Sequence, residues 1–404
     1  MKTTGSRLSD YYKSIGLNPV GHDISRENRM RLHERKRQNL LEHHLKLPLF
    51  GWRGARVLEF GPGSGENAVA LARLGARLTF VEPLDYLSDR LKATFAEFGV
   101  SDRVEAVHTG LLEDFRSSER FDVVFAEGFV HFCENHAAAV RRLLSFTNDE
   151  GFVVLSDIDP AGTFIEFIKK CYLAHTCAAL GLRSDGQRLT MARRLFESEF
   201  ARINHSRGFE SWAKDMVLNP LYRPRYFLDL PTVLKAAPDG VALYSSWPNY
   251  LNADDLIWHK NIRNADSMRA AALRGYYARA PHFLHSVPHP EGGLKPFAPH
   301  DGRRIVTAIR ACCERLDRAV ERNAADPART LAALSSLRRA LTPAREAKLA
   351  RQVVDDAIAL FSAARADAGE TAFVRAWRSR TFLRRLWGTP GHYIVLHKTD
   401  LHAR

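Results

Sequence analysis

Hydrophobic positions follow two alternating periods along residues 54–160. Arg56–Phe60 is a short apolar, β-prone run, a glycine-rich segment follows it, and Ala68, Leu71 and Ala72 then recur at helical spacing. Strands that alternate with helices in this way predict a parallel sheet with helices on its faces. Further strand-like runs lie at 77–81, 104–108, 121–127 and 151–156.

From residue 161 the alternation stops and helical spacing takes over. In the second half, Ile305, Ile309, Cys312 and Leu316 advance by three or four residues, as the buried stripe of an amphipathic helix does. Two later runs, 241–245 and 391–397, read again as strands. The long helical stretches are therefore expected to be insertions into a sheet that is completed near the C-terminus.

The turn after the first strand has the composition of a ligand-binding loop. Gly61, Gly63 and Gly65 lack Cβ atoms, so a ligand can lie against the backbone, and the helix that follows offers free N–H groups. A dinucleotide fingerprint needs its third glycine where this chain has Glu66. The spacing therefore favours a nucleotide-like ligand other than a nicotinamide dinucleotide.

With Glu59 at the end of the first strand, the pattern Glu-Phe-Gly-Pro-Gly-Ser-Gly resembles motif I of the class I S-adenosylmethionine-dependent methyltransferases. The resemblance covers residues 54–160 and, more loosely, 210–260 and 390–399. It implies an α/β fold, a Rossmann-like seven-stranded sheet whose last strand is antiparallel, with two helical insertions. It also implies S-adenosylmethionine as the cofactor and S-adenosylhomocysteine as the product.

The resemblance assigns the cofactor contacts to strand ends. Glu82 ends the second strand, and its two carboxylate oxygens can accept from both ribose hydroxyls. Around the adenine, Leu111 stands where the family often has an acidic residue, so a polar contact must come from Glu113, Asp114 or backbone, or be absent. The expected cofactor-binding residues are Glu59, Gly61, Pro62, Gly63, Gly65, Glu82, Gly110, Leu111, Leu112 and Glu127.

The segment after the fourth strand, residues 128–132, resembles the loop that faces the methyl group. It lacks the Asn/Asp-Pro-Pro-Tyr/Phe signature with which related enzymes hold a planar nitrogen, so DNA adenine methylation is disfavoured. A general base is needed only for a weakly acidic hydroxyl or a protonated amine. His131 has a suitable unperturbed pKa, and Asp157 and Asp159 are the second choices as catalytic residues.

The acceptor is expected to be a small or glycan-linked molecule. Segments around Trp212, Trp247 and Trp258 look like those of bacterial methyltransferases that tailor surface glycans or small molecules. We expect the two insertions to enclose the acceptor, with Tyr244 also nearby, and the second insertion to offer a homodimer contact. The expected domains are a helical N-terminal lid at 1–52 with a helix over 25–46, the cofactor-binding core at 53–160, an insertion at 161–240, the sixth strand at 241–261, a second insertion at 262–387 and the last strand at 388–404.

In the lid, Tyr11, Tyr12 and His22 are further site candidates. Packing between helices and surface polarity are the alternative explanations for these residues.

Two rival functions stay open, and the charge of the chain motivates the first. The net charge is +13, and residues 301–404 hold 20 Lys/Arg against 11 Asp/Glu. Such an excess suits RNA, so an RNA methyltransferase is the first rival, although interleaved charges on amphipathic helices are more often a solvated face. The second rival is a non-catalytic scaffold with a methyltransferase-like domain.

Composition and cysteine usage indicate the class of protein and its compartment. The chain has 404 residues, of which 45% are hydrophobic and 26% charged, as in soluble globular proteins with two domains or large insertions. No run of 18 apolar residues predicts a membrane span, and five cysteines without a Cys-x-x-Cys pair fit a reducing cytoplasm. The histidines at 282, 285, 289 and 300 lack metal-ligand spacing, so no metal site is expected.

Overall fold

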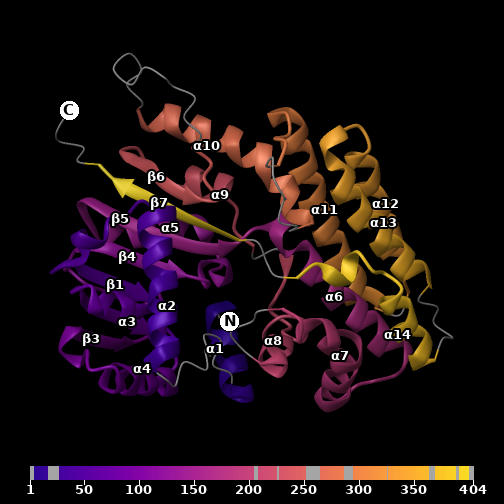
Figure 1. Cartoon of the computed structure of the whole chain (residues 1–404), viewed down its shortest axis with the longest axis horizontal. Helices are drawn as coiled ribbons and strands as arrows, with labels where there is room; N and C mark the ends of the chain where they lie inside the picture. Colours follow the sequence, from indigo (N-terminus) through magenta and orange to yellow (C-terminus); the bar gives the residue numbers. More distant parts are fainter. Residues whose placement is uncertain are drawn as a thin grey trace. The chain divides into compact units, whose positions relative to one another are not determined.

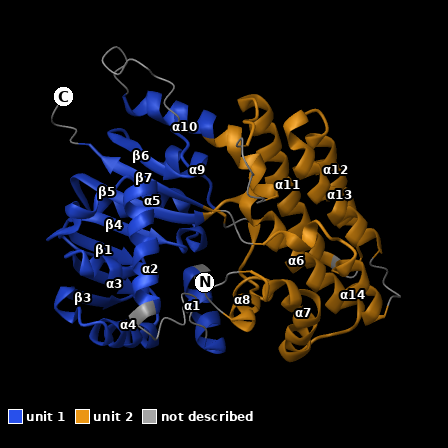
Figure 2. Cartoon of the chain, viewed as in Figure 1, with its two compact units in different colours: residues 1–157, 228–275, 392–404 blue, residues 158–227, 276–391 orange. Residues whose placement is uncertain are grey.

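The computed structural model describes residues 4–16, 27–203, 208–224, 227–251, 264–285, 294–324, 326–363, 369–387 and 391–399. The chain divides into two compact units, coloured separately in Figure 2. The sheet unit comprises Met1–Asp157, Leu228–Gly275 and His392–Arg404, and the helical unit comprises Ile158–Phe227 and Tyr276–Gly391. Each unit is thus assembled from segments far apart in the sequence.

The sheet unit contains one seven-stranded sheet in the order β3-β2-β1-β4-β5-β7-β6. The strands β1 to β5 run parallel, and β7 pairs antiparallel with β6. This order and the antiparallel last strand confirm the expected Rossmann-like fold. The strands are β1 (Arg56–Phe60), β2 (Arg77–Glu82), β3 (Val104–Thr109), β4 (Phe121–Glu127), β5 (Thr147–Ile158), β6 (Val241–Trp247) and β7 (Gly391–Lys398).

Helices cover the sheet because its central strands are apolar on both faces. Val57 and Leu58, which point to opposite faces of β1, are both fully buried. Met30 and Leu41, from the N-terminal segment, share one core cluster with Val57, and Figure 1 shows α2 lying across the sheet. The helices of this unit are α1 (Thr4–Ile15), α2 (Glu27–Asn39), α3 (Glu66–Arg73), α4 (Asp85–Glu97), α5 (His136–Ser145), α9 (Leu230–Ala236) and most of α10 (Ala265–Arg279).

The N-terminal segment differs from its prediction. The helix expected over 25–46 is described from Glu27 and ends at Asn39, and a π-helical turn, Leu40–His44, follows it. The N–H of Leu45 donates to the carbonyl of Leu40 at 2.8 Å, five residues back. The wider turn accompanies the burial of Leu41 and Leu45, which are both fully buried. The continuous helical pattern therefore conceals a change of helix type.

The helical unit is built around α6 (Pro160–Ala179), which is buried along most of its length. Ile305, Ile309, Cys312 and Leu316 of α11 (Pro299–Asn323) are at most 2% exposed, which confirms the predicted amphipathic face. None of the described helices is both long and apolar enough to cross a membrane. The other helices of this unit are α7 (Asp185–Phe200), α8 (Phe209–Asp215), α12 (Ala328–Leu341), α13 (Lys348–Ala363) and α14 (Glu370–Arg378).

The chain returns to the sheet unit at Leu228, before the boundary that the sequence suggested at residue 240. It does so because α9 packs against α5, a helix of the sheet unit. Similarly, α10 stays with the sheet up to Gly275, and the Arg269 guanidinium donates to the carbonyl of Val241 in β6 at 3.0 Å. Residues 228–240 and 265–275 therefore extend the sheet unit and do not belong to the helical one.

Candidate active site

The glycine turn links the end of β1 to α3. Gly61, Gly63 and Gly65 have φ angles of 67°, 60° and 85°, in the left-handed region that favours glycine. A Cβ at Gly61 would lie 3.3 Å from the Phe129 ring, and one at Gly65 would lie 3.1 Å from both Leu91 and Phe95. Backbone conformation and close packing thus both require glycine at the outer two positions, in addition to any ligand.

Glu82, at the end of β2, lies directly against this turn. One carboxylate oxygen accepts from the N–H of Gly63 at 3.0 Å, and the other accepts from the N–H of Leu84 at 3.0 Å. Burial raises the pKa of Glu82 to about 7, although both hydrogen bonds oppose the shift. Each oxygen keeps a second acceptor position, because a carboxylate offers about four. Glu82 is therefore held in place with capacity left for a ligand.

Glu59, at the end of β1, is a second buried carboxylate. Burial raises its pKa to about 8, and the nearby carboxylates of Glu127 and Glu82 act in the same direction. Its Oε2 atom has no hydrogen-bond partner among the described residues. A buried acceptor atom without a partner is costly, so Glu59 is suited to a hydrogen-bond donor or a cation that comes from a ligand.

Glu127, at the end of β4, is paired with an arginine that the sequence did not single out. Arg37 of α2 donates to Glu127 Oε1 at 3.0 Å and lies 3.4 Å from the Tyr393 hydroxyl. Asn67 of α3 donates to the other oxygen at 3.3 Å. Arg37 is one of several cations in a basic helix, so no local pattern distinguishes it. Glu59, Glu82, Glu127 and Arg37 form one cluster at the ends of the strands.

The expected adenine segment follows β3. Its start is fixed by the Gly110 N–H, which donates to the Glu82 carbonyl at 3.3 Å, and by Arg142, which donates to the Leu112 carbonyl at 2.7 Å. Leu112 is buried and Leu111 is half-buried, so either can pack on a flat ring. Glu113 is exposed. The segment is therefore held by contacts to β2 and α5.

His131 and Asp157 form a buried pair. Asp157, at the end of β5, lies 2.5 Å from Nδ1 of the His131 ring and also accepts from the His131 backbone N–H at 2.9 Å. The His131 and Asp157 side chains are only 3% and 1% exposed. The carboxylate thus lies beside Nδ1, although Nδ1 makes no hydrogen bond among the described residues, so the two side chains interact through charge. The structure thus brings together two of the three predicted catalytic residues.

Asp159 has a different environment. Its carboxylate accepts from the N–H groups of Ala161 at 2.7 Å and Gly162 at 3.4 Å, which caps the first turn of α6. The Tyr276 hydroxyl donates to its other oxygen at 2.6 Å. All three donors belong to the helical unit, as Asp159 does. These contacts account for its burial without a role in proton transfer.

The remaining candidates fall in several places. Tyr12 is buried and Tyr11 half-buried in α1, which packs against the 3₁₀ turn Val130–Phe132 that carries His131. Trp212 is buried in the helical unit beside Phe200, with the ring centroids 5.6 Å apart. Trp247 of β6 is 44% exposed. His22, Trp258 and His289 lie outside the described residues.

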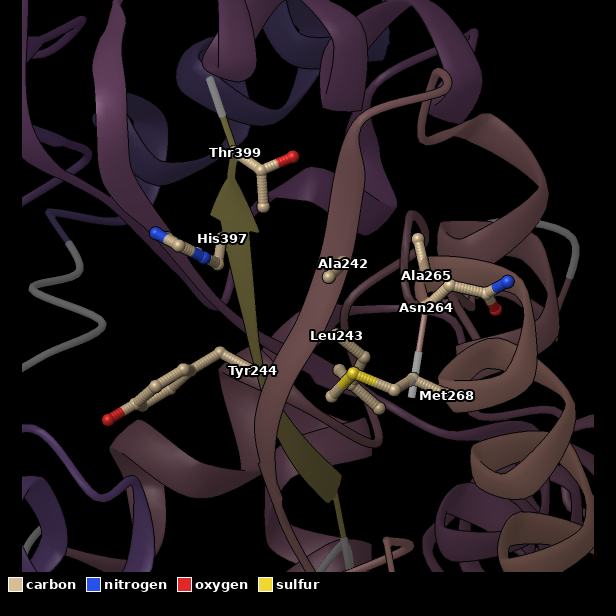
Figure 3. A pocket seen from close by; sticks show the side chains of 8 residues that line it. All are labelled: Ala242, Leu243, Tyr244, Asn264, Ala265, Met268, His397 and Thr399. Atoms are coloured by element: carbon tan, nitrogen blue, oxygen red, sulfur yellow. The ribbon is translucent and has the colours of Figure 1, made fainter. Parts of the chain in front are cut away.

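A cavity of about 210 Å³ lies between β6, β7 and the start of α10, and Figure 3 shows the side chains that line it. Leu243 and Met268 point toward each other in it, whereas Tyr244 points to the other side of β6 and donates to the Lys46 carbonyl at 2.9 Å. The strand order places β4, β5 and β7 between β6 and β1, the strand that leads into the glycine turn. This cavity is therefore separate from the glycine turn.

Metal-ligand candidates do not converge in the part of the chain that the structure describes. No group of three or more His, Cys, Asp or Glu side chains lies close enough there to hold an ion. His282 and His285 lie 3.2 Å apart between their ring nitrogens, and the second nitrogen of His282 faces the Lys295 carbonyl at 2.9 Å.

Comparison with known proteins places these features in context. Residues 13–214 match the family model described as "Methyltransferase domain". Comparison with curated protein sequences finds no match. Among solved structures, the CcbJ methyltransferase from Streptomyces caelestis is similar at 28% identity over 27% of this chain and 45% of that one, with a TM-score of 0.25.

Two further solved structures show comparable similarity. An S-adenosylmethionine-dependent methyltransferase from Mesorhizobium loti matches at 19% identity over 29% of this chain and 51% of that one, with a TM-score of 0.26. The N-terminal domain of EvdMO1 with SAH bound matches at 19% identity over 31% of this chain and 49% of that one, with a TM-score of 0.26. The chain spans about half the length of these neighbours.

Proposed function

We propose, from the premise that this chain belongs to the class I S-adenosylmethionine-dependent methyltransferases, that it methylates a hydroxyl group of a small-molecule or glycan-linked acceptor. Family membership follows from the match over residues 13–214, half of the chain, and agrees with the seven-stranded sheet. The observation that carries the hydroxyl proposal is the buried His131–Asp157 pair, because a hydroxyl is the acceptor for which a base matters most.

The cluster at the strand ends fits the proposed cofactor. Glu82 keeps acceptor capacity for ribose hydroxyls, and the unpartnered Oε2 of Glu59 suits the ammonium group of the methionine part. Gly63, with a left-handed backbone, lets the cofactor lie close to the turn. We assign cofactor binding to these residues together with Gly61, Pro62, Gly65, Gly110, Leu111, Leu112 and Glu127.

When bound, S-adenosylmethionine supplies an electrophilic methyl group. The protein's part is to place the acceptor, exclude water and remove a proton. Nε2 of His131 accepts the proton of the acceptor hydroxyl, and Asp157 stabilises the positive imidazolium that results. Asp157 is thus a positioning residue, and Asp159, with its carboxylate capping α6, is not needed for this step.

A small acceptor and a cytoplasmic location complete the proposal. All five cysteines are free and buried, which suits a reducing compartment. That the helices enclose the acceptor stays a prediction. It would be checked by cross-linking a photoreactive acceptor analogue to Trp212 or Trp247.

An arginine-lined cavity between α11 and α12 gives partial support to an RNA acceptor. Arg315, Arg318 and Arg322 of α11 and Arg329 of α12 line a cavity of about 260 Å³. Its other lining residues are alanines, so it lacks the aromatic platforms that usually accompany binding of single-stranded RNA. The basic charge of this cavity alone does not favour RNA, so a small acceptor remains the stronger proposal.

The test combines acceptor discovery with a base variant. The protein is incubated with isotopically methyl-labelled S-adenosylmethionine and, separately, bacterial metabolites, glycans and RNA, and labelled products are identified by mass spectrometry. His131→Gln should lower kcat by at least about 100-fold while leaving cofactor affinity unchanged. His300→Gln, at an exposed histidine, is the matched control. Label found only in RNA would contradict the acceptor, and full kcat in His131→Gln would contradict the base.

A further inference from the structure

The helical unit contains a cavity of about 520 Å³ that the proposed methyl transfer does not use. Residues of α6, the turn after it, α7, the segment 217–220 and the end of α11 line it. All these residues lie within the helical unit. The volume falls in the range of roughly 300 to 1,000 Å³ that is typical of small-molecule sites.

The wall of this cavity is largely apolar. Leu173, Val217 and Val320 contribute aliphatic surface from three different segments. Cys177 also lines it, and burial raises the pKa of this thiol to about 11 although Arg188 opposes the shift. The thiol is therefore neutral at physiological pH, and the wall suits an uncharged hydrocarbon body.

The charged residues that line the cavity are all cations: Lys170, Arg183 and Arg188. Arg183 and Arg188 are exposed, and neither guanidinium is paired with a carboxylate among the residues that the structure describes. Unpaired guanidiniums beside apolar surface are suited to a carboxylate or phosphate, which their forked donors match.

Lys170 lies deeper than the two arginines. Its ammonium donates to the carbonyls of Asn219 and Tyr222, each at 2.6 Å, and burial lowers its pKa to about 8. An ammonium has three N–H donors, so one remains for a ligand. The nearby carboxylate of Asp317 is already paired with Arg223 at 2.6 Å, which limits its effect on the cavity.

We infer that this cavity binds an amphipathic anion, with a carboxylate or phosphate head at Arg183 and Arg188 and an acyl or alkyl body against the apolar wall. The inference rests on cavity volume, lining and unpaired charge, and is independent of the proposed methyl acceptor. Binding is therefore measured directly, without methyl transfer as the readout.

The experiment is calorimetric titration of the whole chain with octanoate, octyl phosphate and octanol. The anions should bind, and octanol, which has the same chain and no charge, should bind at least about tenfold more weakly. Comparison of octanoate with octyl phosphate distinguishes a carboxylate from a phosphate ligand. Equal affinity for octanol and both anions would overturn the inference.

Two variants locate the site. Arg183→Ala combined with Arg188→Ala should weaken anion binding by roughly tenfold and leave octanol unchanged, because exposed charges each contribute modestly. Arg303→Ala, an exposed arginine of α11 outside the cavity, is the charge-matched control. Ala174→Phe, at a half-buried wall position, should block all three ligands while the melting temperature shows that the chain is folded. Unchanged binding in either cavity variant would show that the ligand binds elsewhere.

Discussion

Both units bury ionisable side chains, but they differ in how those groups are neutralised. In the helical unit, the fully buried Lys169 donates to Glu166 at 2.8 Å and to the Leu386 carbonyl at 3.0 Å, and its Nζ lies 3.5 Å from the centre of the Trp387 ring. In the sheet unit, Glu59 Oε2 has no partner among the described residues. Among its described residues, the helical unit also has a buried acceptor atom without a partner, Oε2 of Glu199, so the difference lies in charge. Lys169 has the carboxylate of Glu166 as its partner, whereas Glu59 lies near two further carboxylates, those of Glu127 and Glu82.

This contrast agrees with the pKa shifts. Burial lowers the pKa of Lys169, and the Glu166 carboxylate opposes that shift, so a partner supports the charged form. For Glu59, burial and neighbouring carboxylates act together, and the pKa rises to about 8 despite Arg37. We therefore expect the Lys169–Glu166 pair to contribute to stability and Glu59 to contribute to ligand binding. Variants at these residues and in the glycine turn test this difference.

The largest effect should come from breaking the matched pair. Lys169→Met leaves Glu166 buried without its cation and should lower the free energy of unfolding by about 3 to 5 kcal/mol. Urea denaturation measures this change. Lys169→Met together with Glu166→Leu should recover most of the loss, because it removes both charges. If the free energy of unfolding of Lys169→Met alone were within about 1 kcal/mol of the native value, the pair would not be structurally important.

The glycine turn should give the next largest effect, on binding. Gly63→Val places a branched side chain at a buried position with a φ of 60° and should weaken S-adenosylmethionine binding by at least about 100-fold. Gly99→Val shares the left-handed backbone, with a φ of 66°, but lies after α4 with open space at its Cβ. It should lose similar stability and keep its affinity in calorimetry. If Gly63→Val and Gly99→Val bound S-adenosylmethionine with equal affinity, the glycine turn would have only a structural role.

Glu82→Ala should weaken cofactor binding by about 1 to 3 kcal/mol, because two ribose hydroxyls lose a charged acceptor. Glu82→Gln keeps one acceptor oxygen and should fall between the native protein and the alanine variant. Glu97→Ala, at an exposed site on α4, is the control and should bind normally. Calorimetry that gives Glu82→Ala native affinity would reject the ribose assignment.

The smallest effect is a pH dependence of stability. The folded pKa values of Glu59 and Glu82, about 8 and about 7, exceed the value of roughly 4.3 for an unfolded glutamate. The folded state therefore binds more protons, and the stability that these groups contribute is complete below the unfolded pKa and lost as pH rises through 7 to 8.

Glu59→Gln cannot ionise, so its melting temperature relative to the native protein should rise between pH 6 and pH 9, by about 2 to 4 °C. Scanning fluorimetry of the cofactor-free protein measures it, with Glu97→Gln as the control. A difference that stays constant across this pH range would mean that Glu59 is already ionised in the folded state.

The sequence alone determined much of the sheet unit. The strand predicted at 121–127 is β4 to the residue, and the glycine turn lies where the pattern placed it. Apolar alternation and glycine positions are local properties, and a parallel sheet brings the ends of its strands to one edge whatever the rest of the chain does. The pattern of strand ends was therefore enough to group the carboxylates Glu59, Glu82 and Glu127.

Tertiary structure alone decided which partners those groups have. Arg37 contacts Glu127 across 90 positions of sequence, and Tyr276 contacts Asp159 across 117, so no periodicity could pair them. Likewise, the packing of α9 on α5 returned residues 228–240 to the sheet unit. Side-chain pairing depends on which surfaces meet after folding, whereas local sequence specifies only the period and the backbone conformation of each element.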